Sequence, residues 1–414
     1  MIPHILYNLV LTLTYPILKF LGVFSIKLSL FTKGRKAVFT QLKSERLDEG
    51  NWVWFHVASL GEFEQARPLM VSHKNFFPEY KILLTFFSPS GYEVQKDFEL
   101  ADCVCYLPWD TPKNTNRFLD FCNIKYALLV KYEFWPNYLM GLSKRKIPTY
   151  SVSSIFRSNQ LFFKNYGKVY RRLLFGIQHF FVQNEASASL LKSIGIDKVT
   201  ISGDTRMDRV YEISQKEERL SLIEQFLGGQ SCFVAGSTWP EDYDLMEHLL
   251  KIQTELKIII APHETSKQSI ERLEKRIEIP YTKWSDFDEK RDQNKTLLIV
   301  DTIGQLTKIY RYAKFAYVGG GMKKNGLHNT LEPASIGIPV IIGKFFNRYE
   351  EAVSLLKKGG ISSVNTSHEF KKIYDLLVHD APLNQKMGDV NAEYVKNGKG
   401  ASQIIIETIK KQMK

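Results

Sequence analysis

The sequence predicts an α/β protein built from two doubly wound parallel sheets. Short apolar, strand-like runs alternate with amphipathic helical stretches along most of the chain, and this alternation is typical of parallel sheets whose strands are joined by helices. The chain has 414 residues, which is more than one hydrophobic core normally serves. The alternation pauses once, between Gly203 and Gln230, and this pause divides the chain into two expected domains.

The strand candidates fall into two sets. The first set consists of residues 53–57, 82–85, 104–107, 127–130, 149–153, 180–183 and 199–202. The second consists of residues 232–235, 257–261, 296–300, 315–318 and 340–342. Gly228 and Gly229 precede the second set and are typical of a hinge end. We therefore expect one domain over residues 36–205 and another over residues 206–414, with an open alternative in which the last helix packs back on the first domain.

Residues 1–35 form a segment of a different kind. The first thirty are rich in Leu, Ile, Val, Phe and Tyr, although Lys19 and Lys27 interrupt them. A spanning helix needs about 20 nearly uninterrupted apolar residues, and a cleaved signal peptide needs an early positive region, which is lacking here. We expect a helix lying on the cytoplasmic leaflet of a membrane, with a single-span anchor as the open alternative. The basic cluster expected to touch lipid headgroups is Lys33, Arg35 and Lys36.

The net charge of the chain is +12 and is concentrated in its first half. Residues 1–205 hold 25 Lys and Arg against 16 Asp and Glu. Apolar and charged fractions of 44% and 24% exclude a disordered chain. No nucleic-acid-binding signature accompanies the charge, so nucleic acid is not an expected partner. The positive first half instead favours an anionic partner such as a membrane surface.

A glycine loop in the second half is the most informative stretch. An apolar run at 315–318 stops at three glycines, 319–321, and a polar loop with His328 and Asn329 then leads to a helix that begins near Glu332. Glycines allow backbone angles and a close ligand approach that a Cβ atom would forbid. The helix start adds free N–H groups and a positive end. A nucleotide phosphate or a sugar carboxylate would suit this place, and an ordinary strand-to-helix turn is the alternative.

Glu62 occupies a comparable place in the first half. It follows the strand candidate at 53–57 in the turn Ser59-Leu60-Gly61-Glu62, just before an expected helix. Open α/β sheets bind ligands at the carboxyl ends of their strands, so this carboxylate is a candidate general base. The alternative is an acidic residue that complements a helix dipole.

Six short motifs keep their order along nearly the whole chain. They are Ser-Leu-Gly-Glu at 59–62, Thr-Phe-Phe-Ser-Pro-Ser-Gly at 85–91, Tyr-Leu-Pro-Trp-Asp at 106–110, Glu-Phe-Trp-Pro-Asn at 133–137, Gly-Asp-Thr-Arg-Met-Asp at 203–208, and the glycine loop with its Glu-Pro-Ala at 332–334. Together they resemble the motifs of the 3-deoxy-D-manno-octulosonic acid (Kdo) transferases of glycosyltransferase family 30. The resemblance implies a GT-B fold, with two Rossmann-like domains facing a central cleft. It also implies inverting transfer of Kdo from CMP-Kdo to the acylated, phosphorylated lipid A precursor (lipid IVA), in lipopolysaccharide biosynthesis at the inner membrane.

The resemblance further implies roles for individual residues. Glu62 would be the catalytic base, and acceptor contacts would come from Ser59, Ser90 and Glu133. Donor contacts would come from Arg206, Ser237, Thr238, His263, Gly319, Gly320, His328, Asn329 and Glu332. Within this set Glu332 would hold the ribose, while Arg206 and the glycine loop would hold the phosphate. Two departures from the family pattern are the missing arginine before His263 and Gln305 in place of an acid.

No metal or other cofactor is expected, because helix ends and basic side chains would replace a metal at the phosphate. Cys103 and Cys105 form one Cys-x-Cys pair without a second pair or histidines in register, so the cysteines are expected to be buried, reduced thiols. Two other functions stay open. One is a GT-B transferase that uses another nucleotide sugar, and the other is a non-catalytic, membrane-bound lipid-binding protein of the same fold.

Overall fold

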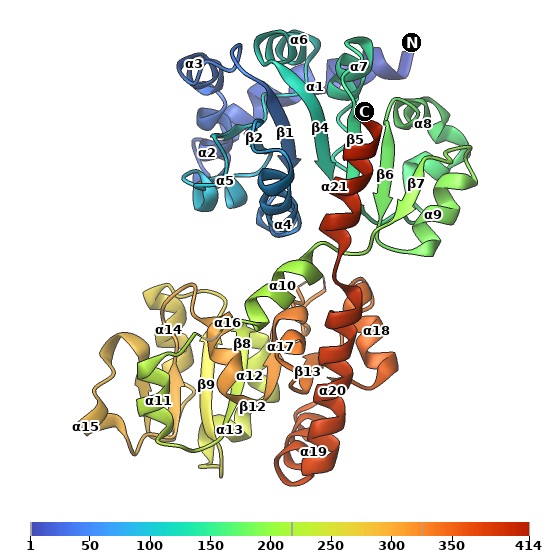
Figure 1. The fold of residues 1–414 in the computed structure, drawn as a ribbon. Helices are drawn as coiled ribbons and strands as arrows, with labels where there is room; N and C mark the ends of the chain where they lie inside the picture. The colour runs from blue at the N-terminus through green and yellow to red at the C-terminus, as the bar shows by residue number, and fades with distance from the viewer. Residues whose placement is uncertain (1, 217, 325, 414) are drawn as a thin grey trace. The chain divides into compact units, whose positions relative to one another are not determined.

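The computed structural model describes residues 2–216, 218–324 and 326–413, which form two compact units (Figure 1). The first unit holds the residues up to Arg209 together with those from Lys399 onward, and the second holds Val210–Gly398. Each unit contains a seven-stranded sheet, and the strand pairs in both sheets are parallel. This is the fold class that the alternating pattern predicted.

The sheet of the first unit has the order β3-β2-β1-β4-β5-β6-β7. Its strands are β1 (Trp52–Val57), β2 (Lys81–Phe86), β3 (Cys103–Tyr106), β4 (Ile124–Val130), β5 (Thr149–Ser154), β6 (His179–Val182) and β7 (Val199–Ile201). The helices between and after them are α4 (Leu60–Phe76), α5 (Pro89–Gln95), α6 (Pro112–Phe121), α7 (Pro136–Lys144), η1 (Leu161–Phe163), η2 (Asn165–Gly167), α8 (Lys168–Leu174), α9 (Glu185–Lys192) and α10 (Arg206–Ser214). The strand order reverses at β1, which pairs with β2 on one side and β4 on the other. Ligands of open α/β sheets bind at such a reversal, beside the carboxyl ends of the strands.

The sheet of the second unit has the order β10-β11-β9-β8-β12-β13-β14 and reverses at β8. Its strands are β8 (Cys232–Thr238), β9 (Lys257–Pro262), β10 (Tyr281–Lys283), β11 (Leu297–Ile299), β12 (Ala313–Val318), β13 (Val340–Gly343) and β14 (Ile361–Val364). Its helices are α11 (Ser221–Leu227), α12 (Pro240–Leu245), α13 (Glu247–Lys251), α14 (Lys267–Glu274), η3 (Trp284–Asp286), α15 (Glu289–Asp292), α16 (Leu306–Ile309), η4 (Tyr310–Tyr312), α17 (Leu331–Ile336), α18 (Glu350–Lys358), α19 (Ser367–His379) and α20 (Ala381–Gly398).

All the predicted strands are present, but β10 and β14 were not predicted. Both are short strands at the edges of the second sheet. Lys283 in β10 and Ser362 and Ser363 in β14 are only partly buried. An edge strand is paired on one side only, so it needs no continuous apolar run, and this is why the apolar pattern misses it.

The core of each unit lies on both faces of its sheet. Along β1, Val53 and Phe55 belong to one buried cluster, while Trp52 and Trp54 belong to another on the opposite face. This follows from the period of two in a strand, which sends neighbouring side chains to opposite faces. Helices must therefore cover both faces, as in a doubly wound fold (Figure 1).

The last helix, α21 (Ala401–Gln412), belongs to the first unit. Ile405 and Ile409 are fully buried in the core cluster that also contains residues of α4. The Asp208 carboxylate accepts hydrogen bonds from the N–H groups of Gly400 and Ser402, the latter at 2.8 Å, which satisfies the free donors at the start of α21. The expected boundary after residue 205 therefore lies four residues further on in the structure, after Arg209, and the chain returns to the first unit at its end.

The N-terminal segment folds into α1 (Ile2–Leu21), α2 (Ile26–Gly34) and α3 (Val38–Ser44). By length and composition, one helix among the described residues, over His4–Leu21, could cross a membrane. One side of α1 is bonded to the first unit: the Tyr7 hydroxyl donates to Asp110 at 2.7 Å, and the Trp109 indole donates to the Leu11 carbonyl at 3.0 Å.

The expected basic cluster at residues 33–36 is corrected by the structure. Lys33 and Lys36 are exposed, but Arg35 is only 6% exposed. Its guanidinium donates to the carbonyls of Phe31, Phe87 and Leu107. Arg35 therefore lies inside the protein rather than on lipid headgroups.

Candidate active site

Glu62 is held at the carboxyl end of β1. The strand ends at Val57, and the turn that follows places Glu62 in the first turn of α4. The Ser59 hydroxyl donates a hydrogen bond to the Glu62 carboxylate, so two of the predicted site residues are in contact. The Glu62 side chain keeps 18% of its surface exposed. A carboxylate that is fixed in place and still reachable can take a proton from a bound molecule.

Lys131 brings an ammonium group to the same carboxylate. It follows β4 directly, and its Nζ lies 3.6 Å from Glu62 Oε1. Its backbone has a φ of +59°, which is unfavourable for a residue with a side chain and is typical of functional sites. The Lys131 carbonyl accepts hydrogen bonds from the hydroxyls of Ser151 and Ser154 at the end of β5. Contacts from the neighbouring strand thus hold this strained turn.

Glu133 belongs to a buried polar network that also contains His56. His56 is fully buried in β1, and its Nδ1 lies 2.8 Å from the Thr85 hydroxyl. On its other side, His56 Nε2 lies 3.2 Å from Trp135 Nε1 and 3.5 Å from Glu133 Oε2. Trp135 also donates to Glu133 at 3.0 Å. The network fixes the predicted acceptor residue Glu133 next to the end of β1.

Ser90, the remaining predicted acceptor residue, lies in the turn after β2. Its hydroxyl is 3.0 Å from that of Ser88, which caps α5. A Cβ atom on Gly91 would lie only 2.4 Å from the Phe86 ring and 3.0 Å from the Ser59 backbone. Gly91 therefore lets the turn with Ser90 pack against the turn with Ser59 and Glu62. The predicted acceptor residues come from the ends of three adjacent strands, β1, β2 and β4.

In the second unit the glycine loop packs against its own protein more tightly than expected. A Cβ atom on Gly319 would lie 2.3 Å from the Ser237 carbonyl oxygen, and one on Gly320 would lie 1.9 Å from the Gly326 carbonyl oxygen. The Gly319 N–H donates to the Gly236 carbonyl, and the Gly320 N–H donates to the Asp242 carboxylate, both at 2.9 Å. These two N–H groups are used within the protein, so the glycines serve close backbone packing.

Asp242 connects this loop to the start of α12. Besides the Gly320 N–H, its carboxylate accepts hydrogen bonds from the Trp239 N–H at 2.8 Å and the Tyr317 hydroxyl at 2.7 Å. Burial raises the pKa of Asp242, although these hydrogen bonds act in the opposite direction. Asp242 was not predicted as a site residue, because two of its three partners, Tyr317 and Gly320, lie far from it in the sequence.

Trp239, His263 and His328 form a stack beside the glycine loop. The rings of His263 and His328 lie 4.3 Å apart, and those of Trp239 and His263 lie 4.6 Å apart. The Trp239 indole N–H donates to His328 Nε2 at 2.9 Å, which requires a neutral imidazole. Burial, together with the charge of His263, lowers the pKa of His328 to about 4. Two predicted donor residues, one from each of two loops, are thus in direct contact.

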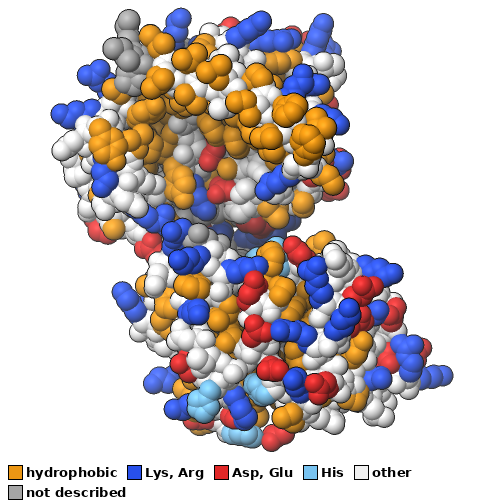
Figure 2. Space-filling model, turned by 180° about the vertical axis from the view of Figure 1, so that it is seen from behind, with side chains coloured by type: hydrophobic (Ala, Val, Ile, Leu, Met, Phe, Trp, Pro, Cys, Tyr) orange, Lys and Arg blue, Asp and Glu red, His pale blue; other side chains and the backbone are white. Residues whose placement is uncertain are grey.

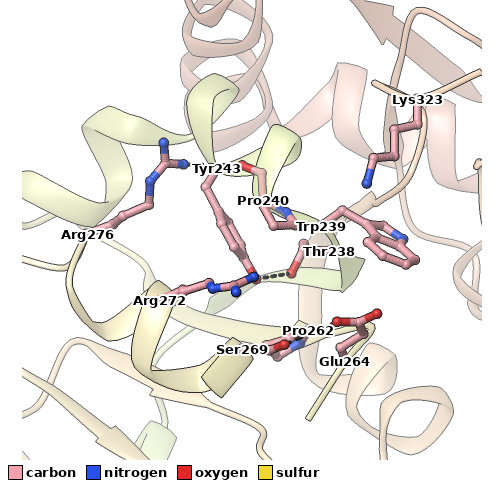
Figure 3. A pocket seen from close by; sticks show the side chains of 10 residues that line it. All are labelled: Thr238, Trp239, Pro240, Tyr243, Pro262, Glu264, Ser269, Arg272, Arg276 and Lys323. Carbon is pink, nitrogen blue, oxygen red and sulfur yellow. Dashed lines mark hydrogen bonds between the residues drawn. The ribbon is translucent and has the colours of Figure 1, made fainter. Parts of the chain in front are cut away.

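A cavity of about 380 Å³ opens next to this stack. Thr238 and Trp239 line it at the end of β8, and Arg272 and Lys323 reach it from different sides (Figure 3). Lys323 also lies over the Trp239 ring, with its Nζ 4.5 Å from the ring centroid. Cationic and hydroxyl groups around one cavity suit an oxyanion such as a phosphate or a carboxylate.

Glu332 lies in the first turn of α17, as expected, and its carboxylate is held from two sides. The Thr307 hydroxyl donates to Oε2 at 2.9 Å, and the Asn329 amide donates to Oε1 at 3.2 Å. The Glu332 carboxylate thus already accepts a hydrogen bond from a hydroxyl group.

Ser237, at the end of β8, has a φ of +52°. Its backbone is strained in the same way as that of Lys131.

Arg206 is bonded to a neighbouring carboxylate. It belongs to the first unit, where its Nε and Nη2 donate to Asp204 at 2.9 and 2.6 Å. Burial would raise the pKa of Asp204, but the charge and hydrogen bonds of Arg206 outweigh it and hold that pKa below its ordinary value. Arg206 was expected in the second domain, but the structure assigns it to the first unit. Its contact with the donor phosphate stays a prediction.

The geometry agrees with comparisons to known proteins. A sequence model of the family described as "3-Deoxy-D-manno-octulosonic-acid transferase (kdotransferase)" matches residues 32–209. A 3-deoxy-D-manno-octulosonic acid transferase of Haemophilus influenzae is 25% identical over 98% of this chain and 97% of its own length. Another, from Aquifex aeolicus, is 28% identical over 78% of this chain and 86% of its own. The chain is similar to these Kdo transferases over most of its length, and this similarity indicates a glycosyltransferase.

The fold of this chain is also found in a solved structure. The UDP-GlcNAc 2-epimerase of Neisseria meningitidis bound to UDP-GlcNAc matches it with a TM-score of 0.62 and 18% identity, covering 87% of this chain and 100% of the other. At this identity the match shows the fold alone. Two Rossmann-like domains in one chain form the GT-B fold that the motifs implied, and the cleft between them stays an expectation.

The cysteines of this chain are buried and unbridged, as expected. Burial raises the pKa of the Cys232 thiol to about 12, so this thiol is protonated at neutral pH. Within residues 2–216, 218–324 and 326–413, no three His, Cys, Asp or Glu side chains come together as a metal site would require.

Proposed function

We propose that this chain transfers Kdo from CMP-Kdo to the acylated, bis-phosphorylated glucosamine disaccharide of the lipid A precursor, on the cytoplasmic face of the inner membrane. The observation that carries the proposal is the turn with Glu62, in a chain that is similar to Kdo transferases. There a carboxylate lies at the reversal of the sheet, where it is bonded to Ser59 and has Lys131 Nζ 3.6 Å away.

The first unit would activate the acceptor. Glu62 would take the proton from the attacking sugar hydroxyl while the oxygen of that hydroxyl forms a bond to the anomeric carbon of Kdo. The bond from that carbon to the CMP phosphate breaks at the same step, which inverts the configuration. Ser90 and Glu133, at the ends of β2 and β4, would hold other hydroxyl groups of the acceptor.

The second unit would bind the donor and stabilise the departing CMP. Glu332 would accept hydrogen bonds from the ribose hydroxyls, in the way that its carboxylate accepts one from the Thr307 hydroxyl. The phosphate and the Kdo carboxylate are both anionic, and the cavity with Arg272 and Lys323 supplies positive charge on the same unit. The proposal includes no metal ion, because these side chains would stabilise the negative charge that develops on the phosphate.

Helix α1 would bring the enzyme to the membrane. Its exposed side carries an apolar stripe in which Leu9, Leu13 and Ile17 are each more than half exposed. The other side is bonded to the first unit through Tyr7 and Leu11. A helix with one face on protein and an apolar face outward favours a position in the membrane interface over a lone spanning helix. Figure 2 shows hydrophobic side chains gathered on this unit, with Lys and Arg side chains around them.

The donor assignment can be tested by nucleotide release. The purified protein would be incubated with the lipid A precursor and, in separate reactions, CMP-Kdo, a UDP-hexose or CMP-sialic acid. We expect acceptor-dependent release of CMP from CMP-Kdo alone. Release of UDP instead would favour another GT-B transferase activity, and no release from any donor would favour a non-catalytic lipid-binding protein.

A further inference from the structure

Arg35 carries a positive charge inside the first unit without a negative partner. The side chain is only 6% exposed, and its three hydrogen bonds go to backbone carbonyls at 2.6 to 2.9 Å. Among the ion pairs formed by the described residues, none involves Arg35. Burial lowers the pKa of Arg35 to about 10, which still leaves it charged at neutral pH.

The ionisable groups around Arg35 do not neutralise it. Those close enough to act on its charge are Tyr15, Tyr106, Tyr138 and Cys105, and burial raises the pKa of each of the three tyrosines. A buried charge is normally paired, because removing it from water is costly. A guanidinium has five N–H donors, and the three hydrogen bonds to carbonyls use one donor on each nitrogen, which leaves one N–H on Nη1 and one on Nη2.

Arg35 forms part of the wall of a cavity of about 340 Å³. Helix α1 lines it through Thr12 and Tyr15, and the loop after β3 adds Trp109 and Thr111. Asn114, in the first turn of α6, completes the polar lining. Hydroxyl, amide and guanidinium groups thus meet aromatic and aliphatic surface in one place. This composition suits a small oxyanion that is attached to an apolar molecule.

The position of the cavity indicates where such a molecule would come from. The residues of α1 next to Thr12 along the helix include the exposed apolar stripe of Leu9 and Leu13. The cavity also adjoins the end of the sheet that carries Glu62, since Arg35 bonds the Phe87 carbonyl just after β2 and the Leu107 carbonyl just after β3. A ligand here would therefore lie between the membrane-facing helix and the strand ends of the acceptor domain.

We infer that this cavity is a subsite for a phosphate monoester of the lipid acceptor, held by Arg35 and by polar groups of α1 and the loop after β3. The inference rests on the proposed function for the identity of the lipid. The phosphate supplies the negative charge that the protein itself does not place beside Arg35, and the site would orient the acceptor before its hydroxyl reaches Glu62.

The first test uses vesicles and needs no transfer activity. Binding of the full chain to phosphatidylcholine vesicles containing phosphatidic acid, a phosphate monoester, is compared with binding to vesicles of equal charge containing phosphatidylglycerol, a phosphodiester. We expect a preference for phosphatidic acid that Thr12→Trp removes, because the indole fills the cavity. Thr40→Trp is the matched control, since Thr40 is exposed on α3 and does not line the cavity. Equal binding to both kinds of vesicle by the unchanged protein would overturn the inference.

The second test uses transfer to two acceptors. Thr12→Trp should raise KM for the bis-phosphorylated acceptor by about tenfold or more, as expected for a lost charge-assisted hydrogen bond. Thr12→Trp should have a much smaller effect on KM for a mono-phosphorylated acceptor that lacks the phosphate bound in this cavity. The subsite would be contradicted if Thr12→Trp changed KM equally for all acceptors, or changed it for none of them. If the unchanged protein transfers nothing, the proposed function fails, while the vesicle test still decides on the subsite.

Two additions separate lipid phosphate from free phosphate and guard against misfolding. Inorganic phosphate should not abolish the preference for phosphatidic acid at concentrations comparable to the lipid, and if it does, the cavity is a site for free phosphate. Arg35→Gln keeps hydrogen-bond donors but removes the charge, and it should lose the preference as Thr12→Trp does. If Arg35→Gln does not fold, Thr12→Trp still decides the question, because Thr12 is exposed.

Discussion

The ammonium group of Lys131 lies 3.6 Å from the carboxylate of Glu62, and the two residues come from the ends of adjacent strands, β4 and β1. Lys131 adopts a left-handed backbone conformation. Strain of this kind persists only where the surroundings hold it, here through the hydroxyls of Ser151 and Ser154. The fold thus fixes the backbone of Lys131 in a position from which its ammonium group reaches the candidate base Glu62.

Replacement of Glu62 by glutamine should abolish most of the activity. The amide is nearly isosteric with the carboxylate but cannot accept a proton, so turnover should fall by roughly 10²-fold or more. Steady-state kinetics would measure this, and calorimetry with CMP would serve as the control because the nucleotide is assigned to the other unit. Near-normal turnover in Glu62→Gln would remove Glu62 from the role of base.

Lys131→Met should lower kcat while leaving the fold intact. The substitution removes the ammonium group beside Glu62 but keeps a side chain of similar length. Loss of the positive charge beside the Glu62 carboxylate would reduce turnover by roughly tenfold. Lys131→Arg should retain part of the activity because it keeps the charge. If both variants lose the same share of kcat, the backbone conformation of this turn, rather than the ammonium group, supports turnover. Thermal unfolding of the two variants would then show a loss of stability.

Glu332→Ala should weaken CMP and CMP-Kdo to the same extent, because both contain the ribose. The expected cost is about 1–3 kcal/mol for a lost hydrogen-bond partner. Thr307→Val removes the hydroxyl that donates to Glu332 but leaves the carboxylate in place, so it should have a smaller effect. Calorimetry would measure both. An unchanged CMP affinity in a folded Glu332→Ala protein would place the nucleotide elsewhere.

His328 should make the stability of the second unit depend on pH. Burial and the charge of His263 lower its pKa from 6.5 to about 4, so the unfolded chain binds a proton at a higher pH than the folded chain does. The contribution of neutral His328 to the free energy of unfolding is fully present above pH 6.5. The free energy of unfolding should fall as the pH drops from 6.5 to about 4, by about 3 kcal/mol at most. Denaturant unfolding at several pH values would show a smaller fall in His328→Gln. An unchanged pH dependence in His328→Gln would mean that the pKa of His328 is the same in the folded and the unfolded protein.

The apolar stripe of α1 should control membrane attachment. Replacing Leu9, Leu13 and Ile17 by serine removes exposed apolar surface, and it should weaken binding to vesicles by about 1 kcal/mol or more per residue. Val94→Ser is a suitable control, because Val94 is 62% exposed on α5. Unchanged vesicle binding together with a loss of thermal stability would instead place the stripe against protein.

The sequence predicted the local features of the fold well. Apolar runs identified the inner strands because these are buried on both faces, whereas the edge strands β10 and β14 lack such runs. Glu62 could be placed because it follows its strand within a short turn, and Glu332 could be placed because Pro333 marks a helix start. The family motifs were needed to turn these positions into chemical roles.

Contacts between distant segments could not be predicted from the sequence. Lys131 meets Glu62, and Asp242 meets Gly320, only because the order of the strands brings their turns together. Arg35 was misread because a basic residue among lysines resembles a surface cluster, while its burial depends on the carbonyls of Phe87 and Leu107. The glycines at 319 and 320 were expected to make room for a ligand, and what occupies that room is the protein's own backbone.

The mass of the lipid product tests the central claim most directly. The purified protein would be incubated with CMP-Kdo and the lipid A precursor, in parallel with Glu62→Gln, and the extracted lipid would be weighed by mass spectrometry. The account predicts that the lipid gains the mass of one or more Kdo residues with the unchanged protein, and very little with Glu62→Gln. An unmodified lipid, in the presence of a protein that is folded and binds CMP, would contradict it.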